Sequence, residues 1–183
     1  LQVSIGERAY AARTIVVPAG QRSLLQEPAS IRDGRRLLQA LRTGSSAATP
    51  TLLLSPLPAV PAVAFGGGET YVGAPSLESA VDSIFGEYHR GLDYAVPAGT
   101  PFSAPASGTV TLAAPLRLSG QTLVIDHGQG VASAFYHLSR IDVIEGQTVD
   151  GRQSLGLSGD SGVAPVPHLH WGVYVHGVAV DPI

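Results

Sequence analysis

The stretch PHLHWGVYVHG, Pro167–Gly177, alternates between large apolar residues and polar or small ones. Successive side chains of a β-strand point to opposite faces of a sheet, so this period of two predicts a strand over His168–His176. The core face of that strand carries Leu169, Trp171, Val173 and Val175. His168 and His170 fall together on the other face, which makes this strand a candidate for carrying a site.

The rest of the C-terminal half is punctuated like a β structure. Glycines recur from Gly91 onward between short apolar runs, a spacing typical of strands and turns. The clearest strands are Gly108–Ala114, Gln121–His127 and Val131–Leu138. Hairpin turns are predicted at residues 126–130 and at His176-Gly177. No long helical pattern interrupts these strands, so the predicted fold class is mainly β.

The N-terminal part predicts a different organisation. Residues 1–18 alternate weakly and favour strands joined by a turn at Gly6-Glu7. Apolar residues at helical spacing, followed by Gly44, predict one short amphipathic helix over Ser30–Leu41. We therefore expect a small β-containing segment with one short helix and a linker over residues 1–70. A β domain follows over residues 71–183.

Two segments of the chain are each open to two interpretations. The apolar run Thr51–Phe65 is too short to span a membrane, and its prolines would break a helix. We interpret it as an extended segment packed on a domain, with a linker as the alternative. Leu77–Phe85 fits a helical turn and the entry to a strand about equally well.

Composition excludes several classes of protein. The 183 residues are 44% hydrophobic and 14% charged, with a net charge of −3, which favours a packed core and disfavours a nucleic-acid partner. The absence of Cys excludes disulfides and thiolate metal sites. The chain starts at Leu1 and contains no Met, as expected after removal of a signal peptide or at a fragment boundary.

Other residues complete a metal-binding composition around the opening strand. His89 and Asp93 lie four positions apart in HRGLD, and His137 lies in FYHLS. Two imidazoles and a carboxylate make a Zn²⁺ site that keeps an open position, and further imidazoles nearby can move protons. This is the composition of a hydrolase site.

His89 and Asp93 can share one ion only if the chain bends between them. Four residues of straight strand span about 13 Å, whereas zinc ligands lie about 2 Å from the ion. A helix would also bring the two residues together, but the sequence that follows Asp93 is typical of extended chain. We expect a bend, and Gly91 is the residue that permits it.

His137 is expected on the strand Val131–Leu138. Simple alternation puts it on the same face as Ser133 and Phe135. It reaches the site if that strand neighbours the one that carries His168.

Two further histidines and a set of regularly spaced glycines are assigned no ligand role. His127, in a hairpin turn, and His176, at a loop tip, are interpreted as structural or exposed. Gly156, Gly159 and Gly162 recur at every third position without a strand–helix pattern around them. They indicate a loop that lies against a site rather than a dinucleotide-binding loop.

One family shares, in the same order and spacing, the segments HRGLDYAVPAGTPFSAPASGTV, LVIDHGQG, YHLS, IEGQTVDGRQSLGLSGDSG and PHLHWGV. Over about residues 84–182 the chain resembles the M23 peptidases, the lysostaphin-like and LytM-like zinc endopeptidases of bacterial cell walls. The resemblance implies a small, mainly antiparallel β fold with a groove over one Zn²⁺ ion. It implies that His89, Asp93 and His170 hold the metal, with His137 and His168 as the catalytic histidines that do not bind it.

The resemblance also implies an activity. It implies a zinc-dependent endopeptidase that hydrolyses peptide bonds in peptidoglycan cross-links, of the D-Ala–diaminopimelate type in a Gram-negative source. Zn²⁺ in such a site lowers the pKa of a bound water to ~7. His168 then acts as general base and His137 stabilises the oxyanion or protonates the leaving amine, or the two exchange roles. A weaker similarity of Tyr10–Gln21 to the small β domain of a periplasmic subset predicts a periplasmic or secreted location.

The chain departs from the family pattern at several positions. Val166 replaces the usual Gly, and Asp160 stands where Thr or Ala is common. These changes affect the groove and substrate preference, and they remove no ligand.

Several alternatives remain open. The first is a catalytically inactive relative that activates a cell-wall amidase, and the second is a wall-binding β module with incidental histidines. A further hypothesis concerns regulation: the N-terminal segment covers the groove and places Glu27, Asp33 or Glu69 at the open zinc position. The sequence identifies no regulatory partner.

Overall fold

The structure is a computed structural model that describes residues 12–17, 19–25, 28–42, 44–46, 52–72 and 88–183. Two predicted features, the turn at Gly6-Glu7 and the segment Leu77–Phe85, lie outside these residues.

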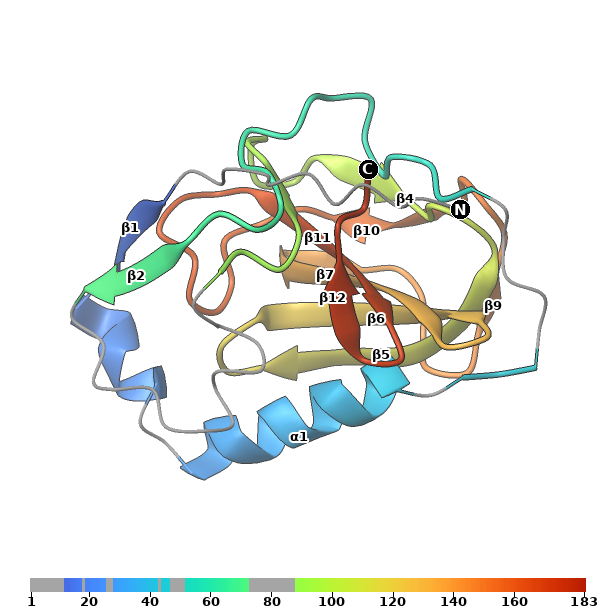
Figure 1. The fold of residues 1–183 in the computed structure, drawn as a ribbon, viewed down its shortest axis with the longest axis horizontal. Helices are drawn as coiled ribbons and strands as arrows, with labels where there is room; N and C mark the ends of the chain where they lie inside the picture. Colours follow the sequence, from blue (N-terminus) through green and yellow to red (C-terminus); the bar gives the residue numbers. More distant parts are fainter. Residues whose placement is uncertain (1–11, 18, 26–27, 43, 47–51, 73–87) are drawn as a thin grey trace, which may run out of the picture.

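The described chain is mostly strand, with one α-helix and one 3-10 helix (Figure 1). In chain order the elements are β1 (Arg13–Val16), η1 (Ala19–Leu25), α1 (Pro28–Arg42), β2 (Glu69–Val72), β3 (Leu92–Tyr94), β4 (Pro101–Ser103), β5 (Gly108–Leu116), β6 (Gly120–Gly128), β7 (Val131–Leu138), β8 (Arg140–Ile141), β9 (Thr148–Val149), β10 (Ser154–Leu157), β11 (Leu169–Val175) and β12 (Val178–Val180). The strands predicted at residues 108–114, 121–127, 131–138 and 168–176 are confirmed to within two residues at every end.

A seven-stranded sheet forms the centre of the molecule. Its strands run in the order β12-β11-β7-β6-β5-β9, and β3 pairs with β11 beside β12. All of these pairs are antiparallel. A three-stranded sheet has the order β4-β10-β8, and β1 pairs with β2 in parallel. The prediction of a mainly antiparallel β fold is therefore confirmed.

The predicted amphipathic helix is present and slightly longer than expected. α1 begins at Pro28, a residue suited to the first turn because it lacks the N–H that this turn would leave unpaired. Figure 1 shows α1 lying along one face of the large sheet. Its buried residues Leu37 and Leu41 belong to one core cluster with Val124 and Tyr174 of the sheet.

A second core cluster fills the opposite face of the large sheet. Trp171 and Phe135 of the sheet pack there with Phe102 of β4. Leu57, only 4% exposed, belongs to the same cluster, and the backbone N–H of Leu54 donates to the carbonyl of Pro105. The run around residues 52–65 is therefore an extended segment packed on the β structure. The division at residues 70 and 71 stays a prediction.

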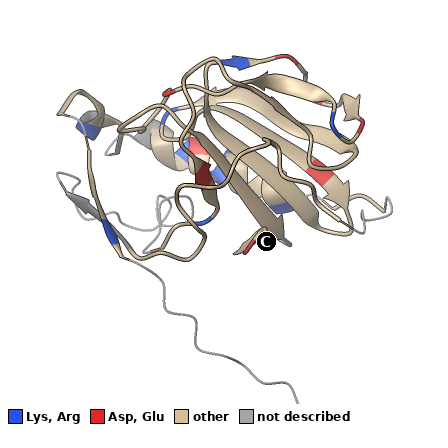
Figure 2. Ribbon diagram, turned by 90° about the horizontal axis from the view of Figure 1, so that it is seen from above, with Lys and Arg blue, Asp and Glu red and all other residues tan. Residues whose placement is uncertain are grey.

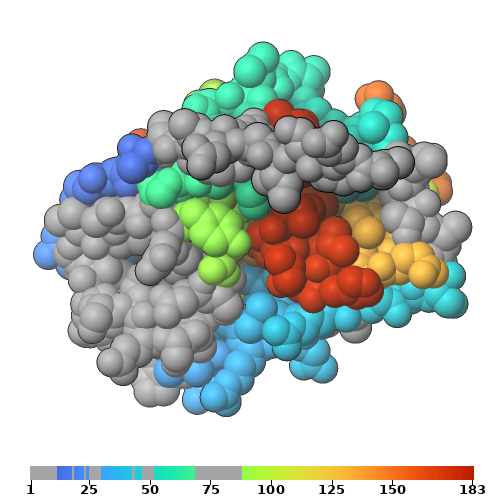
Figure 3. Space-filling view, in the orientation of Figure 1, coloured from blue at the N-terminus to red at the C-terminus, as the bar shows by residue number. Residues whose placement is uncertain are grey.

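The surface carries few charges. Figure 2 shows the Lys/Arg and Asp/Glu positions of the described residues spread over several elements. In the space-filling view the C-terminal hairpin of β11 and β12 (red) reaches the surface, with α1 (light blue) along its lower edge (Figure 3). None of the described helices combines the length and the apolar character needed to cross a membrane.

Candidate metal centre

Strand pairing places Asp93 and His170 side by side. β3 and β11 are antiparallel, and their register sets Asp93 directly opposite His170. His89 precedes β3, and the chain bends at Gly91 before the strand starts. The predicted bend between His89 and Asp93 is therefore confirmed.

Gly91 is required by close packing as well as by the bend. A Cβ atom at this position would lie 2.5 Å from the carbonyl oxygen of Trp171 and 2.7 Å from Nε2 of His170. Both distances are shorter than real side chains tolerate. The absence of a side chain thus lets the loop approach the His170 ring closely. The same ring stacks on Tyr136, with ring centroids 4.8 Å apart and an angle of 2° between the ring planes.

An N-terminal stretch fixes the backbone of both His89 and Asp93. Val63 and Asp93 form an antiparallel bridge, with the N–H of Asp93 3.0 Å from the carbonyl of Val63. The N–H of His89 donates to the carbonyl of Gly67, and the N–H of Gly66 donates to the carbonyl of His89, each at 2.8 Å. Residues 62–68 thus form part of the frame that positions the site.

Three buried atoms converge at the centre of the site. Oδ1 of Asp93 lies 2.9 Å from Nε2 of His89 and 2.9 Å from Nδ1 of His170, and the two nitrogens are 3.2 Å apart. Tetrahedral zinc with ligands at 2.0–2.1 Å sets its ligand atoms about 3.3 Å apart. The observed triangle is within a few tenths of an ångström of that size, so this donor set fits a small divalent cation.

The protonation of His89 follows from its second nitrogen. Nδ1 lies 2.9 Å from the carbonyl oxygen of Ala64, which can only accept, so Nδ1 carries the proton. The lone pair of Nε2 then faces Oδ1 of Asp93 in the neutral ring. Two acceptors at this distance repel unless a proton or a metal cation lies between them, and a carbonyl that fixes the tautomer is typical of metal-binding histidines.

The electrostatics keep the carboxyl group of Asp93 ionised. Burial alone would raise its pKa, but hydrogen bonds with His170 and His89 outweigh burial and hold the pKa of Asp93 well below its usual range. Burial lowers the pKa of His170. At His89 burial is outweighed by the hydrogen bond with Asp93, and the pKa is raised. The donor set therefore contains an ionised carboxylate at neutral pH.

His137 reaches the site through a β-bulge. Between its paired positions β6 has one residue, Thr122, where β7 has two, Tyr136 and His137. His137 has φ 63°, a left-handed conformation that is uncommon outside glycine. The prediction that His137 shares a face with Phe135 is therefore wrong, because the extra residue breaks the alternation. Phe135 points into the core, whereas His137 lines the site cavity.

Both remaining histidines are oriented by backbone carbonyls. Nδ1 of His137 lies 2.8 Å from the carbonyl oxygen of Ser161, and Nδ1 of His168 lies 2.8 Å from that of Val166. Carbonyls only accept, so each Nδ1 donates its proton and each Nε2 keeps a lone pair. The two rings lie 4.8 Å apart, and Nε2 of His168 is 3.8 Å from Oδ1 of Asp93.

The environment of His137 favours its neutral form. Burial, followed by the charge of His168, lowers its pKa to about 3. At neutral pH its Nε2 is therefore a proton acceptor.

The glycine-spaced loop lies against the site, as predicted. The carbonyl of Gly159 accepts a hydrogen bond from the N–H of His168. A Cβ atom on Gly159 would lie 2.7 Å from the carbonyl oxygen of His137. Ser161 closes the loop on the sheet, with Oγ donating to the carbonyl of Leu138 at 2.7 Å. Glycine here permits the loop to approach the strand that carries His137.

A cavity of about 160 Å³ opens over these groups. Its polar lining includes Arg13, Arg90 and the five predicted site residues, and its apolar lining includes Ile15, Val63, Val163, Pro165, Val166 and Pro167. Asp33 is absent from this lining, and its Oδ2 accepts a hydrogen bond from the N–H of Arg117 instead. The latch hypothesis is therefore wrong for Asp33, while Glu27 and the side chain of Glu69 lie outside the described parts.

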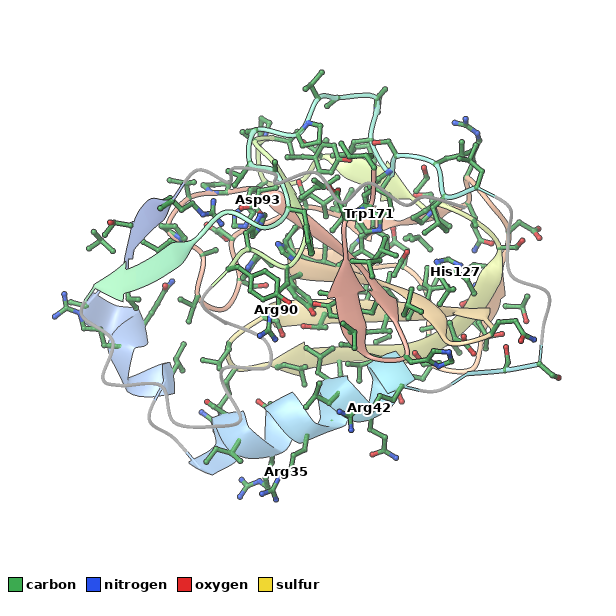
Figure 4. All side chains as sticks on the ribbon, viewed as in Figure 1. Arg35, Arg42, Arg90, Asp93, His127 and Trp171 are labelled. Atoms are coloured by element: carbon green, nitrogen blue, oxygen red, sulfur yellow. The ribbon has the colours of Figure 1, made fainter. Side chains whose placement is uncertain are left out.

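His127 is structural, as interpreted from the sequence. Figure 4 shows it well away from Asp93. Its Nδ1 donates to the carbonyl of Ser107, and its Nε2 lies 2.9 Å from Oγ of Ser133, which also accepts from the indole of Trp171. This buried network is fully paired without a ligand. His176 lies exposed at the hairpin tip between β11 and β12.

Sequence reasoning missed several contributors to the site. Arg13 donates from Nη1 to Oδ2 of Asp93 at 3.0 Å. Ala64 and Ser161 act through backbone carbonyls, which leave no trace in side-chain chemistry. Tyr136 stacks on His170, and its position next to His137 in the chain was the sequence feature that could have placed it near the site.

Comparison with known proteins agrees with this geometry. The profile of peptidase family M23 matches residues 87–182. Peptidoglycan DD-endopeptidase ShyA of Vibrio cholerae is 39% identical over 93 residues, which cover 51% of this chain and 22% of that protein. The chain thus matches about a fifth of the length of that relative.

Two solved structures share the fold. A putative M23 peptidase from Pseudomonas aeruginosa superposes with a TM-score of 0.64 at 37% identity, covering 82% of this chain and 57% of that one. A zinc-containing peptidase from Vibrio cholerae gives 0.60 at 26% identity, covering 75% and 40%. The family profile spans more than half of the sequence and includes all five residues of the site. The chain therefore belongs to peptidase family M23.

Proposed function

We propose that this chain is the catalytic part of a zinc-dependent endopeptidase that hydrolyses peptide bonds in peptidoglycan cross-links, of the D-Ala–diaminopimelate type. The observation that carries the proposal is the buried triangle of His89, Asp93 and His170, with separations of 2.9–3.2 Å, beside two further histidines in one cavity. The name of the related DD-endopeptidase supports the substrate class. We also propose a periplasmic or secreted location.

The three buried donors would hold Zn²⁺. Two imidazoles and a carboxylate are a ligand set of catalytic zinc. When bound, Zn²⁺ supplies a Lewis acid that polarises the peptide carbonyl and lowers the pKa of water at its open position.

His168 and His137 would move the protons of the reaction. Each offers the lone pair of Nε2, because each Nδ1–H is donated to a carbonyl. His168 is the proposed general base, since its Nε2 lies 3.8 Å from Asp93 at the edge of the donor set. The proton that His168 takes from water would pass to the leaving amine, with Nε2 of His137 as an acceptor on that route; the two rings lie 4.8 Å apart.

The strongest rival is an inactive relative that activates an amidase. That role does not require a complete ligand set, whereas the described residues include all three proposed ligands in one buried cluster. The geometry thus favours the enzyme.

The test is mass analysis of muropeptides released from purified sacculi, with and without a chelator. We expect cleaved cross-links that disappear with chelation. Asp93→Ala and His170→Ala should lose metal and activity together. His137→Ala should keep the metal and lose about two or more orders of magnitude in rate. Sacculi left intact by metal-loaded protein would contradict the proposal and favour the activator.

A further inference from the structure

The carboxylate of Asp93 is divided between two sets of partners. Oδ1 faces Nε2 of His89 and Nδ1 of His170, at 2.9 Å each. Oδ2 accepts a hydrogen bond from Nη1 of Arg13 at 3.0 Å. One side chain therefore joins the metal-binding triangle to strand β1, which is 80 residues away in sequence.

Backbone pairing delivers Arg13 to this position. The N–H of Arg13 donates to the carbonyl of Gly68 at 2.7 Å, and Gly68 forms a bridge with Tyr88. The adjacent Gly67 accepts from the N–H of His89. The ladder that places His89 thus also places Arg13, and Figure 1 shows β1 paired beside β2 at one end of the molecule. Backbone pairing therefore fixes where Arg13 meets Asp93, unlike an ion pair between two side chains on a freely exposed surface.

We propose that Arg13 is a positioning residue of the metal centre. It holds the outer oxygen of Asp93, so that the carboxylate binds the ion through a single oxygen and leaves a position open for the reaction. This inference rests on the proposed function. Arg13 lies outside residues 87–182, which match the family profile, so the N-terminal segment completes the site.

The physical reason is the choice that a carboxylate offers a metal. Both of its oxygens can bind one ion, and the second oxygen then takes up a coordination position. A charge-assisted hydrogen bond to the second oxygen opposes that rotation. The Arg13 side chain is 32% exposed, so solvent weakens the ion pair. Orientation, more than electrostatic strength, is therefore its contribution.

The same position would also allow β1 to act as a cover, meaning a strand that blocks access to the cavity. Arg13 and Ile15 of β1 both line the cavity, and a strand that blocks the cavity would restrain the enzyme. The two roles differ in sign: removal of a positioning residue lowers turnover, whereas removal of part of a cover raises it. The backbone ladder to His89 favours positioning, because it makes β1 part of the frame of the site.

The experiment compares the wild-type chain with Arg13→Ala, Arg13→Lys and Val16→Ala, each loaded with Co²⁺ in place of Zn²⁺. The visible absorption of bound Co²⁺ weakens as its coordination number rises. We expect a weaker band in Arg13→Ala at unchanged metal stoichiometry, and a kcat about 10- to 100-fold lower with Zn²⁺. Arg13→Lys keeps the cation and should lie closer to wild type. Val16→Ala, the control from the same strand, is 60% exposed and outside the cavity lining, and it should match wild type.

Two outcomes would overturn the inference. One is a wild-type spectrum and kcat in Arg13→Ala. The other is a higher kcat in that variant, which would identify β1 as a cover. Failure of the wild-type protein to bind Zn²⁺ or Co²⁺ would instead overturn the proposed function, so the two failures are distinguishable.

Discussion

The buried His137 makes the stability of this protein depend on pH in a calculable way. Burial and the charge of His168 lower its pKa to about 3 in the folded state, against about 6.5 in an unfolded chain. Folding therefore favours the neutral ring. The stability that this provides is fully present above about pH 6.5 and is lost as the pH falls from there toward 3.

The size of the effect can be worked out for a fall from pH 8 to pH 5. At pH 8 the unfolded ring is almost entirely neutral. At pH 5 its protonation stabilises the unfolded state by about 2 kcal/mol, while a folded pKa of about 3 leaves the native ring neutral.

The assay is urea unfolding of wild type and His137→Gln at both pH values, with a chelator present so that metal loss contributes to neither. Glutamine does not titrate, and its amide can still donate to the carbonyl of Ser161. We expect the wild type to lose about 2 kcal/mol more than the variant between pH 8 and pH 5. Equal losses in the two proteins would refute the reasoning, because His137 would then not be held neutral by burial.

Three further substitutions test other parts of the structure. Gly91→Ala puts a Cβ atom 2.5 Å from the carbonyl oxygen of Trp171. It should lower the free energy of unfolding by about 1–3 kcal/mol and weaken metal binding, as measured by urea unfolding and Zn²⁺ titration. Gly20→Ala, with open space around it, is the neutral control. Ser133→Ala leaves the buried indole N–H of Trp171 and Nε2 of His127 unpaired. It should lower the free energy of unfolding by about 1–3 kcal/mol and retain activity. Loss of activity at full stability would contradict this. His168→Ala should keep the metal in elemental analysis but lower kcat about 100-fold or more, and unchanged turnover would remove it from the mechanism.

Local patterns in the sequence were enough to predict the strands. Alternating side chains and flanking turn residues mark Leu169–Val175 and Val131–Leu138, so these elements could be read from single segments even though both of their faces are buried. The bend at Gly91 was predictable because two ligands four residues apart cannot otherwise share an ion. Glycine spacing at residues 156–162 likewise indicated a loop against the site.

Long-range relations were not predictable in the same way. The face on which His137 lies depends on a bulge opposite Thr122, and one extra residue reverses every side chain that follows it. The tautomers of His89 and His137 depend on the carbonyls of Ala64 and Ser161. Any residue can supply a carbonyl, so side-chain identity carries no signal for these contacts.

The sequence by itself determined the chemistry of this protein: its donor atoms, the strands that carry them, and the family motifs that connect them. Only the tertiary structure decided the geometry of the site, including the pairing of Asp93 with Arg13 from a strand that precedes the family-matched region. The reason is physical. Composition and periodicity record what each residue prefers locally, whereas the approach of two groups distant in sequence is set by the packing and backbone pairing of the whole chain.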